Sequence, residues 1–229
     1  MPISKWFTKL MKNEPTPKNK QPWLIDESKC LNSHEVIKIR QTAERLKLKG
    51  LKTQRFTLIR NWFMIELSIH AGLRVNEMAH LQNGDLLIEG SRSSIVVIGK
   101  GQKRRSVWIS SYFREICHTY FQLKQQFGFS LKPNAYILPN LKDERISKRS
   151  LQKMFKAIAR QANLAPHYSI HCMRHTYATF LLKASNYNYR FVQQQLGHAS
   201  IKTTQIYATV LETDGRNALE KMYRKEDMP

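Results

Sequence analysis

The sequence predicts a mainly α-helical domain of the α+β class that carries one small antiparallel β-sheet. Most of the chain shows apolar residues at helical spacing between capping residues, whereas one central stretch is rich in β-branched residues and contains a glycine turn. With 229 residues, of which 41% are hydrophobic, the chain can bury a core of one or two domains. This composition excludes a disordered chain.

Capping residues define where the predicted helices begin and end. Asn32 or Ser33 can cap the first helix, which is predicted to run to about Leu48 and to be terminated by Gly50. The second helix stops at Gly72, in the position where a left-handed cap is favoured. Helices are predicted over residues 33–48, 54–71, 75–81, 110–127 and 147–162.

Three β-rich runs form the predicted sheet, over residues 85–89, 93–98 and 106–109. The sequence GKGQKRR connects the last two runs, so the turn is predicted to carry Lys100, Lys103, Arg104 and Arg105. From Arg92 to Arg105 there are five basic residues and no acid. Such a run neutralises phosphates. The residues predicted to bind the backbone of a nucleic acid are therefore Arg92, Lys103, Arg104 and Arg105.

The charge of the chain predicts a polyanionic partner. Lysine and arginine number 38 against 17 acidic residues, which gives a formal net charge of +21 and a pI near 10.1. Nucleic acid is the predicted ligand, and its binding should weaken steeply with salt. Charge alone leaves open a solvated basic surface, or a ribosome-associated or membrane-surface protein.

Cysteine usage predicts a reducing compartment. Cys30, Cys117 and Cys172 are odd in number and irregularly spaced, which argues against a disulfide framework. No apolar run approaches the length of a membrane span, and the basic N-terminus lacks the apolar core and cleavage site of a secretory signal. The protein is therefore expected in the cytoplasm, with no membrane partner.

The first 30 residues differ in character from the rest of the chain. Residues 1–30 combine a short, basic, amphipathic pattern with the proline-rich linker EPTPKNKQP, and the compact domain is predicted over residues 31–229. The segment is expected to be an interface or docking element, with membrane-surface attachment as the alternative. Its apolar residues at helical spacing are Ile3, Trp6, Phe7, Leu10 and Met11.

Polar residues cluster on one predicted helix near the C-terminus. Ser169 can cap the helix of SIHCMRHTYATFLLKAS. His171, Arg174 and His175 stand on it at i, i+3 and i+4, and they share a face that is available to a ligand. An ordinary amphipathic helix with solvated histidines is the alternative. A zinc pair at His171 and His175 is another, but the glutamate of an HExxH site and a third ligand are missing, so no metal site is predicted.

Three further positions complete a set that suits phosphodiester chemistry. Arg74 follows the predicted helix end at Gly72, and His198 precedes a helix that Ser200 can cap. Tyr207 lies two turns into that helix. Taken singly, His198 and Tyr207 suit a helix terminus and a packing position. Together, two arginines, a lysine, histidines and a tyrosine suit the attack of a phenol on a phosphodiester.

The order and spacing of these signals resemble those of the tyrosine recombinase, or phage integrase, family. The resemblance covers the chain from about Leu31 to Tyr223 and implies the catalytic-domain fold of that family. It rests on five motifs in register: GLRxxE at 72–77, GKG at 99–101, HxxRH at 171–175, LGH at 196–198, and a tyrosine nine positions later.

The resemblance implies that Tyr207 attacks the scissile phosphate and forms a covalent 3′-phosphotyrosyl DNA. Arg74 and Arg174 would clamp the non-bridging oxygens, where a guanidinium stabilises the charge of the transition state. Because a phenol has a reference pKa of about 10, Tyr207 needs positive neighbours and a proton acceptor, for which His171 is expected.

The remaining site residues also take their roles from the resemblance. Lys100 would protonate the departing 5′ oxygen, and His198 would hydrogen-bond a phosphate oxygen. If the hairpin turn is shifted by two or three residues, Lys103 takes this role of proton donor in place of Lys100. His175 is a secondary residue that would orient its neighbours. No cofactor is required, because the phosphotyrosyl bond keeps the energy for resealing.

The resemblance implies a site-specific recombinase for integration, excision, inversion or resolution. It would act as a homotetramer on two double-stranded DNA sites, associated with the nucleoid, with accessory DNA-bending proteins as further partners. A last helix bearing Leu219, Met222 and Tyr223 would pack on the adjacent protomer or on its own domain. A DNA-binding relative without activity and a type IB topoisomerase-like enzyme are the alternatives.

One departure from the family concerns the N-terminus. Family members usually carry a separate helical domain before the catalytic domain, whereas only about 30 residues precede Leu31 here. No full N-terminal core-binding domain is therefore predicted. The chain is either a short recombinase or a trimmed one.

Overall fold

The computed structural model describes residues 29–90, 92–99 and 104–197. The predictions for residues 1–28 and for the C-terminal helix lie outside this range. Four predicted site residues lie outside it as well: Lys100, Lys103, His198 and Tyr207.

Helices form most of the described chain and one three-stranded sheet accompanies them, which confirms the predicted α+β class. In chain order the elements are α2 (Ser33–Lys52), α3 (Phe56–Ala71), α4 (Val75–His80), the 3-10 turn η3 (Asn83–Asp85), β1 (Leu86–Leu87), β2 (Ser94–Ile98), β3 (Arg104–Trp108), α5 (Ser111–Gln126), α6 (Lys148–Gln161), α7 (Ile170–Ala184) and α8 (Tyr189–Leu196).

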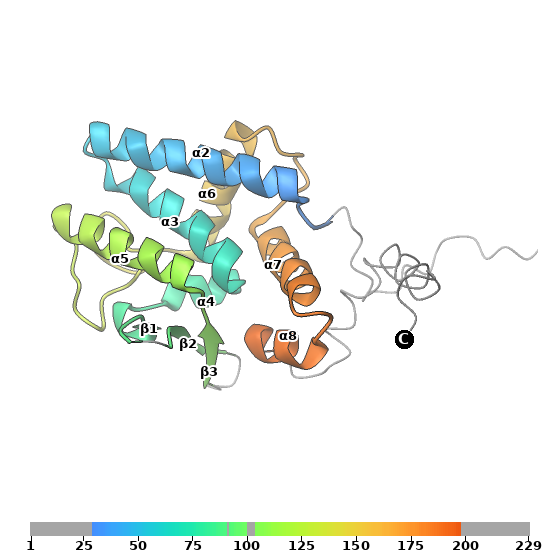
Figure 1. Cartoon of the computed structure of the whole chain (residues 1–229). Coiled ribbons are helices and arrows are strands. Elements are labelled where there is room, and N and C mark those ends of the chain that lie inside the picture. The colour runs from blue at the N-terminus through green and yellow to red at the C-terminus, as the bar shows by residue number, and fades with distance from the viewer. Residues whose placement is uncertain (1–28, 91, 100–103, 198–229) are drawn as a thin grey trace, which may run out of the picture.

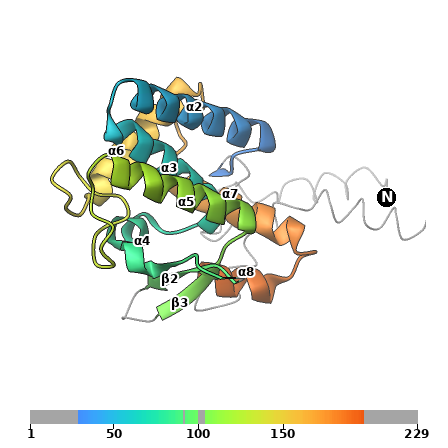
Figure 2. The ribbon, with the colours of Figure 1, turned by 60° about the vertical axis from the view of Figure 1, so that its left-hand side comes forward.

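The elements lie in helical layers above the sheet. Figure 1 shows α2 across the top, α3 and α5 below it, and the sheet at the bottom. α8 lies beside β3 in this view and also in the turned view of Figure 2. None of the described helices is both long and apolar enough to cross a bilayer.

The two ends of α2 give one confirmed prediction and one wrong one. Asn32 caps the helix, because its side-chain oxygen accepts a 2.9 Å hydrogen bond from the Glu35 N–H, and the Glu35 carboxylate accepts one of 2.9 Å from the Asn32 N–H. The helix does not end near Leu48, however, but continues through a buried Gly50. A Cβ on Gly50 would lie 3.0 Å from the Ile59 side chain. The glycine therefore lets α3 approach α2 closely and does not terminate the helix.

The later helices begin close to where capping residues predict. Ser110 accepts a hydrogen bond of 3.2 Å from Phe113 N–H at the start of α5. Ser147 does the same for Ser150 N–H, at 3.0 Å, at the start of α6. α8 is not among the predicted helices. The Asn188 side chain caps it.

The sheet has the predicted antiparallel pairing, in the order β1–β2–β3. Its buried face carries Leu86, Ile95 and Val107, which are paired across the strands. β1 is shorter than the predicted run 85–89, because η3 includes Asp85.

β3 starts earlier than predicted, and this moves two arginines out of the turn. Arg104 pairs with Ile98 and Arg105 pairs with Val97, because the antiparallel ladder continues to the end of β2. The prediction that both arginines lie in the turn is therefore wrong. Successive strand side chains point to opposite faces, so Arg104 is exposed whereas the Arg105 side chain is only 13% exposed.

α3 lies at the centre of the core and fixes the start of the candidate site. The Phe63 ring stacks on Tyr120 of α5, with ring centroids 3.8 Å apart. The same helix packs against α2 and α7. Its C-terminal end is therefore held on several sides, and Arg74 follows directly after it.

Candidate active site

Arg74 takes its position from the end of α3. Gly72 ends this helix in the left-handed conformation, with φ at 56°, as predicted. A Cβ at Gly72 would lie 2.2 Å from the Tyr177 ring, so only glycine fits both the backbone and the space. Arg74 then occupies the N-cap position of α4, and its side chain is 42% exposed.

Glu77 lies one turn into α4, with its side chain 4% exposed. Its carboxylate accepts hydrogen bonds from the Arg74 backbone N–H at 2.8 Å and from Arg74 Nη1 at 2.9 Å. Arg105 of β3 donates two further hydrogen bonds, of 2.9 and 3.0 Å, one to each carboxylate oxygen. The sequence element AGLRVNE therefore supplies both an arginine and the acid that orients it.

The pKa of Glu77 reflects these partners. Burial alone raises the pKa, but the hydrogen bonds and positive charge of Arg105 and then of Arg74 outweigh burial. The pKa consequently lies below its usual value, and Glu77 is ionised at neutral pH.

Arg174 reaches the same carboxylate from α7. Its Nη1 lies 4.0 Å from Glu77 Oε2, and its side chain is 8% exposed. Nη1 also donates to the carbonyl oxygen of Gly72, and Nη2 to that of Leu196, both at 2.7 Å. The guanidinium is therefore fixed between the end of α3 and the end of α8. The predicted polar face of α7 is only partly open, because Arg174 is buried while His171 is exposed.

Contacts between β3 and α8 hold the other side of the site. The Gln195 side chain, 3% exposed, accepts a hydrogen bond of 3.1 Å from Trp108 N–H, and Arg105 Nε donates to the Gln195 carbonyl at 3.3 Å. Gly197 ends α8 with φ at 64°, and a Cβ there would lie 2.5 Å from Arg105 Cδ. These contacts set the position of the Leu196 carbonyl that Arg174 binds.

Three guanidinium groups thus meet at one buried carboxylate. Arg74, Arg105 and Arg174 contribute three positive charges against the single negative charge of Glu77, which leaves two positive charges in excess. Arg74 is the most exposed of the three. A planar guanidinium matches the oxygens of a phosphate. The arrangement therefore suits an anionic ligand that approaches from the Arg74 side.

Two histidines lie on α7 beside Arg174. His171 is exposed on the first turn, and His175 follows one turn later and is half-buried. Burial, followed by the positive charges of Arg174, His171 and Lys29, lowers the pKa of His175 to about 4. His175 is therefore neutral at pH 7, and can orient its neighbours but cannot supply positive charge.

Stability is expected to fall as the pH drops from about 6.5 to about 4, and His175 is expected to cause part of this loss. In this range the unfolded chain protonates His175 while the folded chain does not, so the unfolded state binds more protons and protonation favours unfolding. Urea unfolding at several pH values should show a loss on the order of 2 kcal/mol from this residue. His175→Gln should flatten the curve over that range. Parallel curves for the two proteins would contradict the assignment.

The other predicted site residues divide into two groups. Lys100, Lys103, His198 and Tyr207 lie outside the described residues, and their roles stay predictions. Arg92 and Arg104 are exposed, whereas Arg105 binds the Glu77 carboxylate. DNA contacts by these three arginines also stay predictions.

Two residues of the site were not assigned a role from the sequence. Glu77 stands three residues after Arg74, a spacing at which side chains meet on a helix, so the GLRxxE box did contain a signal for this pair. Gln195 carries no comparable signal, because its partner Trp108 is distant in the sequence and is bound through its backbone N–H.

The described residues offer no cluster of three or more histidine, cysteine, aspartate or glutamate side chains that could hold a metal ion. His171 and His175 therefore find no third zinc ligand in residues 29–90, 92–99 and 104–197.

Known proteins resemble this chain over a range much longer than the site. The model of the phage integrase family matches residues 29–213. Tyrosine recombinase XerC of Vibrio cholerae serotype O1 is 38% identical over 149 residues, which are 65% of this chain and 46% of that protein. The chain thus spans about half the length of the relatives that it matches.

Two solved structures share the fold at low sequence identity. XerH site-specific recombinase, bound to palindromic difH substrate in a post-cleavage complex, has a TM-score of 0.68 and 23% identity, over 85% of this chain and 53% of that one. A lambda integrase tetramer bound to a Holliday junction has a TM-score of 0.54 and 19% identity, over 78% of this chain and 47% of that one. The range matched by the family model runs past both Arg74 and Tyr207.

Proposed function

This chain belongs to the phage integrase family, and from that premise we propose that it is a site-specific recombinase that cleaves and rejoins DNA strands through a covalent 3′-phosphotyrosyl intermediate. The observation that carries the proposal is the meeting of Arg74 and Arg174 at Glu77. Arg74 lies between α3 and α4, Arg174 lies on α7 far along the sequence, and both contact one buried carboxylate. An excess of positive charge held in one place is what a transferring phosphoryl group requires.

In the proposed reaction the hydroxyl of Tyr207 attacks the phosphorus of the scissile phosphodiester. The bond from phosphorus to the 5′ oxygen breaks, and a bond to the tyrosine oxygen forms. His171 accepts the phenol proton, and Lys100 protonates the 5′ oxygen as it leaves. The exposed position of His171 on α7 is compatible with contact to DNA. Attack by a 5′ hydroxyl on the phosphotyrosyl bond reverses these steps and reseals a strand.

Arg74 and Arg174 contribute differently to phosphate binding in this proposal. Arg174 is held by two backbone carbonyls, so its guanidinium already has a fixed orientation at the site. Arg74 is more exposed, and Glu77 holds one of its nitrogens, so it can turn its remaining donors to the ligand. His198 would add one hydrogen bond to a phosphate oxygen.

A nicked suicide substrate tests the chemistry. Loss of a short fragment beyond the cut traps the covalent product, so the protein should shift DNA to a band that resists SDS. Tyr207→Phe should abolish this band completely, because it removes only the nucleophilic oxygen. His34→Gln, which alters an exposed residue at the start of α2, is the matched control and should keep the band.

The same assay separates the alternatives. Absence of a covalent band on every site tested would favour a DNA-binding relative without activity. A covalent band together with relaxation of a single plasmid, and without exchange between two sites, would favour a type IB topoisomerase-like enzyme. Exchange between two sites would support the recombinase.

We further propose that duplex DNA binds to the exposed surface of α6. This helix packs against α4, whose first residue follows Arg74, and against α7, which carries Arg174. Its exposed residues are basic or neutral, and at helical spacing they include Arg149, Lys153, Lys156 and Arg160. A basic face on this helix would hold the DNA backbone while the site acts on one phosphate.

Removing two charges from this face should weaken binding and its dependence on salt. The double variant Lys153→Gln/Arg160→Gln is expected to reduce the slope of log K against log salt by about 1 to 2. Lys49→Gln/Lys52→Gln removes two exposed charges from the end of α2 and should change the slope less. Fluorescence anisotropy with a labelled duplex at several salt concentrations measures both. Equal slopes for the two variants would argue against a DNA contact at α6.

A homotetramer on two DNA sites is part of the proposal. The lambda integrase structure with the same fold is a tetramer bound to a Holliday junction, which supports the assembly as a model for this chain. Mass measurement of the protein on a synthetic four-way junction would test it. A complex with one or two protomers would contradict it.

A further inference from the structure

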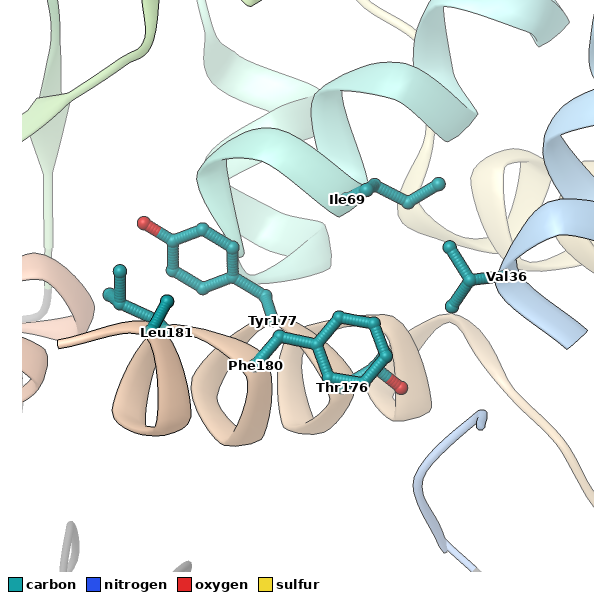
Figure 3. Close-up of a pocket in the computed structure, with 7 residues that line it drawn as sticks. Val36, Ile69, Thr176, Tyr177, Phe180 and Leu181 are labelled. Carbon is teal, nitrogen blue, oxygen red and sulfur yellow. The ribbon is translucent and has the colours of Figure 1, made fainter. Parts of the chain in front are cut away.

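An apolar groove lies between α2, α3 and α7. Figure 3 shows Val36 of α2 and Ile69 of α3 facing Phe180 of α7 across it. Tyr177 and Leu181 line the α7 side, and the cavity has a volume of about 220 Å³. The groove has room for a large side chain, and its walls offer few polar groups.

Two of the helices that form the groove also carry exposed apolar side chains. Phe180 is 37% exposed, and Ile37, which follows Val36 on α2, is 52% exposed. Apolar side chains that lie together at a surface mark a place where another apolar surface binds. The shape, a trough beside one helix, suits the apolar stripe of a second helix.

We propose that this groove binds residues 3–11 of the same chain. These residues lie outside the described part of the structure, and their sequence supplies the ligand. The apolar positions fall at i, i+3, i+4, i+7 and i+8, which is one stripe of a helix, and lysines occupy the opposite side. The apolar residues are Ile3, Trp6, Phe7, Leu10 and Met11.

The described chain enters the domain beside the groove. The Leu31 N–H donates a 2.8 Å hydrogen bond to Thr176, which lines the groove, and the Cys30 sulfur lies 3.7 Å from the hydroxyl of the residue one turn later, Thr179. Residues preceding this entry point therefore start at one end of the site. A segment that lies shortly before this point in the sequence is therefore tethered close to the groove.

The linker is long enough for this contact. From Thr176 to Ala184 the groove side of α7 extends over about 12 Å. Residues 12–28 separate the segment from the described chain, and even in a proline-type extended form they can span roughly 50 Å. Because the segment is tethered, its effective concentration at the groove is on the order of millimolar. A weak contact is therefore sufficient to keep the groove occupied.

Photo-crosslinking of the full chain tests the proposal. The photoreactive amino acid p-benzoylphenylalanine is placed at position 180 in place of Phe180, and an equal mixture of unlabelled and 15N-labelled protein is irradiated. Digestion and mass spectrometry should recover crosslinks to peptides within residues 1–12. They should join light to light and heavy to heavy only, because the contact lies within one chain.

The same probe in place of Leu48 serves as the positional control. Leu48 is 57% exposed on α2 but does not line the groove, so its yield of crosslinks to residues 1–12 should be at least about tenfold lower. Mixed light–heavy crosslinks would overturn the proposal in favour of a second copy. Crosslinks to residues 213–229 would overturn it in favour of the C-terminal segment. Equal yields at positions 48 and 180, or no crosslink to residues 1–12, would also overturn it.

A matched pair of variants checks that the apolar stripe is the ligand. Trp6→Asp/Phe7→Asp should reduce the crosslink yield at position 180 at least about fivefold. Lys5→Gln/Thr8→Asp lowers the charge of the segment by the same two units outside the apolar stripe and should leave the yield unchanged. Neither variant touches the described core, so the melting temperature should be similar in both. An equal loss in the two variants would contradict recognition of the stripe.

Discussion

Glu77→Ala should lower the free energy of unfolding by about 3–5 kcal/mol. The substitution removes the one carboxylate at which three arginines meet, while Arg105 and Arg174 stay buried, with side chains 13% and 8% exposed. Two buried positive charges would then lie close together without the negative charge between them. Urea unfolding at neutral pH measures the loss, and Glu77→Gln should lie between the alanine variant and the natural protein.

A second buried carboxylate provides the control. Glu66 is also 4% exposed, and it binds Arg40 through both oxygens, with His70 Nε2 3.3 Å away. Burial alone raises the pKa of Glu66, but its bonds to His70 and Arg40 lower the pKa below its usual value. Glu66→Ala should also destabilise the protein, and less so because Arg40 is 32% exposed. Only Glu77→Ala should reduce DNA cleavage at a temperature where both variants are folded. Equal cleavage by the two would show that Glu77 supports the fold alone.

Arg174→Lys should reduce the rate of covalent DNA cleavage by about 10²–10³-fold. A lysine keeps the positive charge but has one compact donor group, which cannot hold the Gly72 and Leu196 carbonyls and a phosphate together. The measurement is single-turnover cleavage of the suicide substrate. Because Arg174 is buried and the whole chain carries a net charge of +21, the affinity for DNA should change little.

Arg160→Lys is the matched control for this variant. Arg160 is exposed on the basic face of α6, where charge and not bidentate geometry is expected to matter, so cleavage should be nearly unchanged. If Arg174→Lys weakens DNA binding as much as it slows cleavage, the division between a buried catalytic arginine and a basic binding surface is wrong.

Local sequence signals predicted much of the fold because many helix boundaries depend on local chemistry. Asn32 and Gly72 act at the predicted boundaries through a capping box and a left-handed residue. Gly50 misled the prediction because its role depends on the approach of α3, which a local pattern does not contain. The start of β3 was missed for a similar reason, since pairing with β2 draws Arg104 and Arg105 into the strand.

The sequence predicted several residues of the candidate site but not the contacts between them. Motif spacing identified Arg74 and Arg174, whereas the acid between them, Glu77, received no role. The burial of Arg174 was also unexpected, because helical spacing placed it on a polar face with His171. Its environment is set by carbonyl groups at the ends of two other helices. Because every residue has a backbone carbonyl, the sequence does not show which of them binds Arg174.

The hydrogen bond from Arg174 to the Leu196 carbonyl couples the position of the Arg174 guanidinium to that of α8. Leu196 is the last residue of α8, and the chain leaves the described structure directly after the following glycine. A displacement of the chain beyond that point would move α8, and through the 2.7 Å contact with the Leu196 carbonyl it would also move the guanidinium that is proposed to hold the phosphate. A neighbouring molecule that pulled on the C-terminal part of the chain would therefore shift the proposed phosphate contact of Arg174 from a distance.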